Sequence, residues 1–199
     1  MNSRPALAYV GVGSNIRAEE NVRRALEVLS ENPEVTLSGI STFYRTAPIA
    51  DPTDSIRLPG QDGQVLDPDF LNGVLELRTF LSSDELLAFF TEVEVALGRE
   101  RPGKRYAPRT MDLDLLLFGR DENPEALPIW EEIGPEGFLA HTDIEIRPFV
   151  AHPLMELAPD LTLPPHGTPL RAFVATFGTP GGRAEDDFTE SLRSRFLSA

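Results

Sequence analysis

The sequence contains no cysteine and no long apolar run, and each absence excludes a class of protein. Without cysteine there are no disulfides, no thiolate metal sites and no cysteine nucleophile. No stretch is long and apolar enough to span a bilayer, and the first fifteen residues lack the apolar core and cleavage pattern of a signal peptide. These absences predict a cytoplasmic protein without a membrane partner.

Positive charge is scarce as well. The chain has 32 acidic residues against 18 Lys and Arg, a formal net charge of −14. Such a chain repels phosphates in general, which argues against nucleic acid as a partner. The stretch from Arg99 to Arg109 is an exception, because it holds five bases and one acid, Glu100. We call it the basic island; its bases are Arg99, Arg101, Lys104, Arg105 and Arg109.

Three common catalytic motifs are missing. There is no G-x-x-x-x-G-K-[S/T] loop and no G-x-S-x-G, which argues against a P-loop fold and a serine hydrolase. The three histidines, His141, His152 and His166, show no H-E-x-x-H spacing, which argues against a zinc site.

The 199 residues suffice for one domain with a sizeable core, and we expect one domain over residues 1–199. Ser82 and Glu85 have capping-box spacing at the start of the clearest helix, which Gly98 ends. The expected elements are a strand at 7–15, a helix at 19–31, strands at 35–44 (with a bulge near Gly39) and 70–79, a helix at 82–97 and a strand at 111–119. Their order predicts an α+β, ferredoxin-like βαββαβ sandwich with C-terminal additions.

The remaining segments are less regular. Residues 45–69 hold four prolines and two glycines and predict a long functional loop, whereas alternation at 70–79 predicts a strand with one buried face. A short helix is expected at 148–157. The tail from residue 171 either docks as a helix near "DFTESLRSRFL" or stays mobile.

The strand that follows the basic island carries two aspartates. Side chains alternate along a strand, so Asp112 and Asp114 share one face, while Met111, Leu113, Leu115 and Leu117 share the other. Two carboxylates whose Cα atoms are roughly 6 to 7 Å apart can share a divalent ion such as magnesium. The alternative is a pair that is solvated or bound to Arg109.

Together, the aspartates and the basic island resemble the two halves of a nucleotide–magnesium site, because arginine binds phosphate in a bidentate manner. A solvated charged loop is one alternative. An RNA-binding patch is another, but the exposed aromatic pair expected on such a sheet is not evident.

A set of motifs in fixed order resembles one family. They are "GSN" at 13–15, "YRTAP" at 44–48, "FLN" at 70–72, "GRER" at 98–101, "PRTMDLDLLLFG" at 108–119, H-x5-R-x-F at 141–149 and "PLMELAP" at 153–159. The chain is similar, from about Leu7 to Pro164, to the 6-hydroxymethyl-7,8-dihydropterin pyrophosphokinases of folate biosynthesis. Residues 165–199 form an extension to which the resemblance assigns no role.

The resemblance implies transfer of pyrophosphate from ATP to the hydroxymethyl oxygen of the pterin, with release of AMP. Two Mg²⁺ ions would be held by Asp112 and Asp114, and Arg99 and Arg109 would join these aspartates as catalytic residues. The implied pterin site is Thr46, Ala47, Pro48, Phe70, Asn72 and Phe149. The implied ATP site is Glu94, Arg99, Arg101, Arg109, Leu115, His141 and Arg147.

The loop after Ile49 and the basic island would correspond to mobile loops that close over the substrates, and a monomer is expected. Two rival readings stay open. One is a magnesium-dependent nucleotidyl- or phosphotransferase with a different acceptor. The other is a ferredoxin-like binding module without activity, which the intact aspartates and arginines disfavour.

Overall fold

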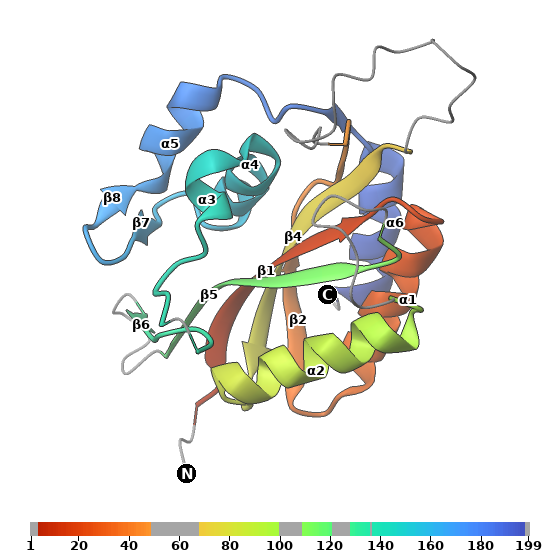
Figure 1. Cartoon of the computed structure of the whole chain (residues 1–199), viewed down its shortest axis with the longest axis horizontal. Coiled ribbons are helices and arrows are strands. Elements are labelled where there is room, and N and C mark those ends of the chain that lie inside the picture. Colours follow the sequence, from red (N-terminus) through yellow and green to blue (C-terminus); the bar gives the residue numbers. More distant parts are fainter. Residues whose placement is uncertain (1–3, 49–67, 100–108, 121–127, 136, 198–199) are drawn as a thin grey trace.

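The computed structural model describes residues 4–48, 68–99, 109–120, 128–135 and 137–197. An antiparallel sheet lies between two layers of helices (Figure 1). The strands of this sheet are β1 (Ala6–Ser14), β2 (Val35–Ile40), β3 (Tyr44–Thr46), β4 (Phe70–Thr79), β5 (Asp112–Arg120), β6 (Ile129–Trp130) and β9 (Arg183–Ala184). The helices are α1 (Ala18–Glu31), α2 (Ser83–Ala96), α3 (Asp143–Ile146), α4 (Pro148–Leu157), α5 (Leu170–Phe177) and α6 (Asp186–Phe196).

The sheet is built around β1, which pairs with β4 on one side and β5 on the other. The strand order is β6-β5-β1-β4-β3-β9. Strand β3 pairs with the first part of β4, and β2 pairs with the last part of β4 on the same edge. Two short strands, β7 (Thr162–Leu163) and β8 (Thr168–Pro169), form a separate hairpin. This arrangement confirms the expected α+β class.

Helices α1, α2 and α6 cover one face of the sheet and enclose the larger core. Val22, Leu26 and Leu29 form the buried stripe of α1, at the helical spacing seen in the sequence. The capping box of α2 is present as predicted: the Glu85 backbone N–H donates to Ser82 Oγ, and the Glu85 carboxylate accepts from the Ser82 backbone.

Helices α3, α4 and α5 cover the opposite face and enclose a second core. The prediction of one buried face for β4 was therefore wrong, because Val74, on the second face, is fully buried beneath this layer. The expected span of β4 is confirmed, as is the short helix α4, whose Pro148 takes the first helical position where no backbone N–H is needed.

Two irregularities depart from the predicted strands. The register of β1 and β5 shifts between Tyr9 and Val10, which leaves Leu116 as an extra residue on β5. This bulge directs the Leu117 side chain into the second core. The prediction that Leu117 shares a face of the strand with Met111 was therefore wrong. The expected strand at 35–44 is interrupted after Ile40, where Ser41 Oγ accepts from the Val74 backbone, and the bulge expected near Gly39 is confirmed.

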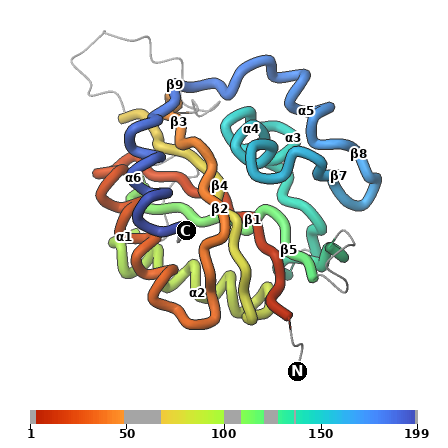
Figure 2. The backbone as a smooth tube through the Cα atoms, turned by 180° about the vertical axis from the view of Figure 1, so that it is seen from behind, coloured from red at the N-terminus to blue at the C-terminus, as the bar shows by residue number. Residues whose placement is uncertain are grey.

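The C-terminal segment docks on the rest of the chain. Phe188 and Leu192 of α6 belong to the larger core, and β9 adds a strand beside β3. Figure 2 shows α6 packed beside the segment of β2 and β3. Of the two alternatives for the tail, the docked helix is the one observed.

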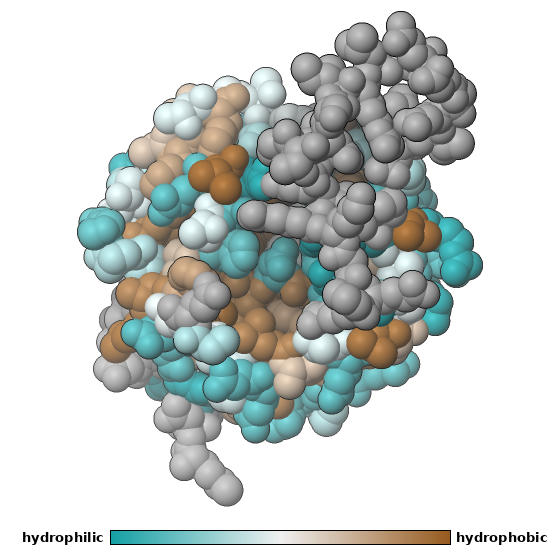
Figure 3. Space-filling model, viewed as in Figure 1, coloured by the Kyte–Doolittle hydropathy of each residue, from teal (hydrophilic) through white to brown (hydrophobic). Residues whose placement is uncertain are grey.

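The face of the molecule in Figure 3 is mixed: hydrophilic residues separate several hydrophobic groups, one of which lies near the middle of the view. Among the described helices, none is long and apolar enough to cross a membrane.

Candidate active site

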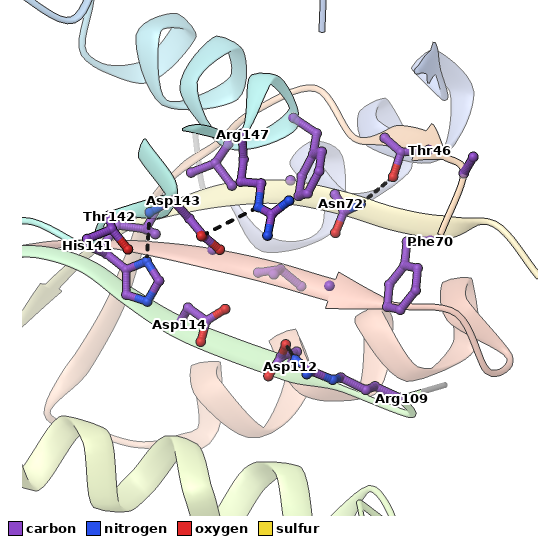
Figure 4. Close-up of a pocket in the computed structure, with 18 residues that line it drawn as sticks. Thr46, Phe70, Asn72, Arg109, Asp112, Asp114, His141, Thr142, Asp143 and Arg147 are labelled. Atoms are coloured by element: carbon purple, nitrogen blue, oxygen red, sulfur yellow. Dashed lines mark hydrogen bonds and ion pairs between the residues drawn. The ribbon is translucent and has the colours of Figure 1, made fainter. Parts of the chain in front are cut away.

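A cavity of about 360 Å³ opens on the second face of the sheet, where the side chains change from apolar to small and polar (Figure 4). Leu7 and Tyr9 of β1 fill this face beneath α4, but the next residues with the same orientation are Gly11 and Gly13. Because glycine has no side chain, the strand floors the cavity without filling it.

The pairing register places the polar residues of the cavity in two rows across β1. Gly11 lies opposite Asp114 on β5, and Gly13 lies between Asp112 on β5 and Asn72 on β4. A Cβ added at Gly13 would lie 3.0 Å from Asn72 Oδ1, whereas one at Gly11 would make ordinary contact with Leu116 at 3.5 Å. Gly13 therefore leaves room for the Asn72 amide.

Asp112 is held by two arginines. Arg99 donates to Asp112 Oδ1 at 2.5 Å, and Arg109 donates to the other oxygen, Oδ2. Arg99 also pairs with the buried carboxylate of Glu94 on α2, which accepts from the Leu113 backbone N–H at 2.9 Å. The raised pKa of Arg99 reflects the charges of Asp112 and Glu94, which outweigh its desolvation.

The end of β1 fixes the backbone around Arg109. Asn15 Oδ1 accepts from the Arg109 backbone N–H at 2.7 Å, and the Asn15 backbone N–H donates to the Arg109 carbonyl at 3.0 Å. Ser14 Oγ donates to the Thr110 carbonyl at 2.6 Å. The motif "GSN" thus anchors the entry to β5.

Asp114 has a different electrostatic environment from Asp112. Burial raises its pKa from 3.8 to about 7, and the negative charges of Asp112 and Asp143 act in the same direction. The opposing effect of Arg109 does not cancel them. A bound cation would relieve this unfavourable charge.

The far wall of the cavity comes from the segment before α4. The His141 backbone N–H donates to the Leu116 carbonyl at 2.9 Å, so the bulge of β5 anchors this histidine above the strand. Asp143 donates its backbone N–H to His141 Nδ1 at 3.2 Å, and its carboxylate lies 3.6 Å from Arg147 Nε (Figure 4). The segment therefore places His141 and Arg147, which can both bind phosphate, over Asp114.

The other end of the cavity is more apolar. Asn72 Nδ2 donates to Thr46 Oγ1 at 2.8 Å, which fixes the amide and leaves one N–H and the carbonyl oxygen for a ligand. Phe70 and Phe149, both half-buried, line this cavity together with Ala47. Aromatic faces and a single oriented amide suit a flat heteroaromatic ring.

The sequence-predicted site residues differ in where the structure places them. Those that line the cavity are Thr46, Ala47, Phe70, Asn72, Arg109, Asp112, Asp114, His141, Arg147 and Phe149. Arg99 and Glu94 stand behind Asp112, whereas Pro48 is not among the lining residues. The side chain of Leu115 lies in the larger core, on the opposite face from the cavity, so only its backbone could approach a nucleotide. Arg101 and the two expected mobile loops lie wholly or mostly outside the described residues.

Sequence reasoning missed three lining residues with clear structural roles. Gly11 and Gly13 fall in the predicted strand at 7–15, and Gly13 also in the motif "GSN", but glycines that alternate toward the end of a buried strand indicate a surface left open. Asp143 was also missed. Its spacing of two residues from His141 and four from Arg147 was the available signal.

The carboxylates fit a divalent cation. No described group of three or more acidic or histidine side chains is arranged to ligate one ion. An ion between Asp112 and Asp114 would therefore take further ligands from phosphate oxygens and water, as magnesium commonly does. The buried charge of Asp114 is what such an ion would compensate.

Comparison with known proteins identifies the family. Residues 9–159 match the family described as 7,8-dihydro-6-hydroxymethylpterin-pyrophosphokinase. The 2-amino-4-hydroxy-6-hydroxymethyldihydropteridine pyrophosphokinase of Pseudomonas aeruginosa is 36% identical over 157 residues, 78% of this chain and 83% of the relative. The enzymes of the same name from Bacillus subtilis (36% over 152 residues; 76% and 77%) and Haemophilus influenzae (34% over 160 residues; 79% and 84%) are similarly related. The chain belongs to the 7,8-dihydro-6-hydroxymethylpterin-pyrophosphokinase family.

Proposed function

We propose that this protein transfers pyrophosphate from ATP to 6-hydroxymethyl-7,8-dihydropterin, giving AMP and the pterin diphosphate in folate biosynthesis. The observation that carries the proposal is the row Asp112–Gly13–Asn72, which joins a charged end of the cavity to an end suited to a flat ring. The two substrates would meet above Gly13.

Arg109, His141 and Arg147 bind the phosphates, and Arg99 supports Asp112 from behind. Asp112 and Asp114 hold magnesium, with two ions proposed, and the bound metal neutralises phosphate charge as it develops. Arg99 and Arg109 both pair with Asp112, so a role of this carboxylate in holding magnesium requires at least one arginine to exchange it for a phosphate oxygen.

At the other end, Phe70 and Phe149 bind the two faces of the pterin, and Asn72 binds its edge together with the backbone of Thr46, Ala47 and Pro48. The hydroxymethyl oxygen forms a bond to the β-phosphorus, the bond from that phosphorus to the α,β-bridging oxygen breaks, and AMP departs. The hydroxyl proton is lost, and Asp112 is the carboxylate to test as its acceptor. Orientation and charge stabilisation supply most of the catalysis.

We further propose that the βαββαβ core is a ferredoxin-like sandwich and that residues 1–199 form a single domain. The pairing order β5-β1-β4-β2 supports the first proposal, and the docking of α6 on the larger core supports the second. A monomer and a cytoplasmic location stay predictions.

Product analysis tests the reaction. The protein is mixed with ATP, Mg²⁺ and the hydroxymethyldihydropterin, and the nucleotides are separated by chromatography. AMP formed in equal amount with pterin diphosphate is the expected result, and an Asp112→Asn variant serves as the inactive control. ADP would indicate an ordinary kinase, and no pterin product with ATP still bound would favour a transferase with another acceptor.

A further inference from the structure

The last described segment of the chain, residues 181–197, returns to the wall of the substrate cavity. It lies beyond the residues 9–159 that match the family. Its strand β9 pairs antiparallel with β3, with Tyr44 opposite Ala184 and Arg45 opposite Arg183. The next residue on β3, Thr46, lines the cavity and accepts the hydrogen bond of Asn72, so the segment adjoins the proposed pterin site through β3. Figure 2 shows β9 beside β3.

Two glycines of the segment contact both sides of this end of the cavity. A Cβ added at Gly182 would lie 2.4 Å from the Arg45 carbonyl oxygen and 2.7 Å from Thr46 Cγ2, so its main chain packs closely against β3. Gly181 has a positive φ of 79°, and a Cβ there would lie 3.2 Å from Pro148 Cγ, next to Phe149. One dipeptide therefore spaces β3 from the start of α4.

Hydrogen bonds and charges fix the strand from the same side. The Glu185 backbone N–H donates to the Phe43 carbonyl at 2.8 Å, and the Phe43 backbone N–H donates to Thr189 Oγ1 at 3.0 Å. The Glu185 carboxylate also pairs with Arg45 Nε at 2.9 Å. Phe43 itself is fully buried and meets Phe188 edge to face, with 5.7 Å between ring centroids.

The residues before β3 are held in the same way. Arg193 of α6 donates to the Ile40 carbonyl at 2.9 Å and pairs with Glu156 of α4 at 2.6 Å. Glu156 in turn accepts from the Thr42 backbone N–H at 2.8 Å. Residues 40–45 thus take many of their polar partners from α4 and the C-terminal segment, and not from β4 alone.

We propose that residues 181–197 are a positioning element for the pterin site. They set the place of Thr46, which orients the Asn72 amide, and they space Thr46 from the start of α4 and Phe149. The inference rests on the proposed function, because it assumes that the pterin binds at this end of the cavity. The hydrogen bonds and ion pairs described above join the segment to Ile40, Phe43 and Arg45, whereas Asp112 is held by Arg99 and Arg109, so we expect the phosphate end to depend less on the segment.

Matched variants at Thr189 test the proposal. Thr189→Val removes the acceptor of the Phe43 backbone N–H, and Thr189→Ser keeps a hydroxyl there. The KM for pterin and the KM for ATP are measured well below the melting temperature of each variant. Thr189→Val is expected to raise the pterin KM about fivefold to tenfold with ATP KM within twofold, and Thr189→Ser to restore the wild-type value.

Two further variants keep the test decisive if Thr189→Val folds poorly. Gly182→Ala forces its Cβ against Arg45 and Thr46, and it should raise the pterin KM in the same selective way. Leu192→Ala removes a buried side chain of α6 that belongs to the larger core, so it should lower the melting temperature without a selective change in pterin KM.

The result that overturns the inference is an active wild type whose Thr189 and Gly182 variants show unchanged, or equally raised, KM values for both substrates. A wild type that binds ATP but neither binds nor converts the pterin overturns the proposed function, and the inference with it.

Discussion

Asp112 and Asn72 occupy the same row of the sheet, one on each side of Gly13. Neighbouring strands lie about 4.8 Å apart, so the Cα atoms of the two residues are separated by about 10 Å. This span suits a ring bound at one residue with its reacting oxygen directed toward phosphates bound at the other. The distance is set by backbone hydrogen bonds in the centre of the sheet and therefore does not depend on flexible side chains.

Substitution of Gly13 by alanine tests whether the pterin ring binds at the Asn72 end of this row. Its Cβ would lie 3.0 Å from Asn72 Oδ1, so the amide must shift by a few tenths of an ångström from the position in which it faces the ligand. We expect the dissociation constant of pterin to rise at least tenfold, measured by titration calorimetry with a non-hydrolysable ATP analogue present. Gly11→Ala is the matched control, because its Cβ meets Leu116 at an ordinary 3.5 Å. Equal effects of the two variants on pterin binding would contradict the assigned place of the ring.

Asp114→Asn should stabilise the protein and lower its activity. The neutral amide removes a carboxylate whose pKa is raised to about 7 by burial, so at pH 8 without magnesium the melting temperature should rise. Turnover should fall by two orders of magnitude or more, because a magnesium ligand is lost. Asp112→Asn is the comparison: it breaks pairs with Arg99 and Arg109 and should lower the melting temperature. Near-normal turnover of Asp114→Asn would exclude its role as a metal ligand.

The same group makes stability depend on pH. The folded protein holds the Asp114 proton up to about pH 7, whereas the unfolded chain releases it near 3.8, so the folded state binds more protons between these values. The contribution of Asp114 to the free energy of unfolding should therefore fall as pH rises from 4 to 7 and level off above. The total loss is up to about 4 kcal/mol.

The measurement is urea unfolding across pH 4–8 without magnesium, for the wild type and Asp114→Asn. The difference between the two curves should carry the slope, since other titrating groups are common to both proteins. A difference that does not change with pH would show that Asp114 titrates near its ordinary value in the folded state.

Phe149→Ala should weaken pterin binding far more than ATP binding, because the ring is assigned to one face of the pterin. We expect a tenfold or greater rise in the pterin dissociation constant and less than a twofold change for ATP. Phe173→Ala is a suitable control, since Phe173 is also partly buried against the second core but does not line the cavity. Equal losses for both substrates in Phe149→Ala would assign this ring to the core instead.

Glu94→Gln should destabilise the protein through the network behind Asp112. Glu94 is 3% exposed and accepts from Leu113 while pairing with Arg99, so its neutralisation leaves a partly buried guanidinium with less compensating charge. The free energy of unfolding should fall by about 2 kcal/mol or more. Glu27→Gln breaks an exposed pair with Arg195 and should change stability by less than about 1 kcal/mol. Similar values for the two variants would contradict the importance of the buried pair.

Much of this fold could be predicted from local sequence. Alternation gave the bounds of β4, the Ser82–Glu85 pair gave the start of α2, and apolar spacing gave α1. What local patterns could not predict depends on contacts distant in sequence. The break after Ile40 is stabilised by Ser41 bonding to Val74, and the bulge at Leu116 supplies a carbonyl for His141.

The residues of the candidate site also differ in whether the local sequence predicts them. The ordered motifs pointed to ten residues that the structure gathers around one cavity, because those motifs lie at strand ends and on the segment before α4. Asp143 was missed because its effect on Asp114 arises across the cavity, and its spacing from His141 and Arg147 alone does not indicate that effect. The place of Leu115 in the ATP site stays a prediction that involves only its backbone, because strand alternation from Asp114 directs its side chain into the larger core.

Transfer of the intact pyrophosphoryl group is the central claim, and labelled ATP tests it most directly. The protein is supplied with Mg²⁺, hydroxymethyldihydropterin and ATP that carries a radioactive β-phosphate, and the label is followed by chromatography. The account predicts that the β-label leaves the nucleotide and appears in the pterin diphosphate while unlabelled AMP accumulates. A β-label that stays on ADP, with the pterin gaining a single phosphate, would contradict it.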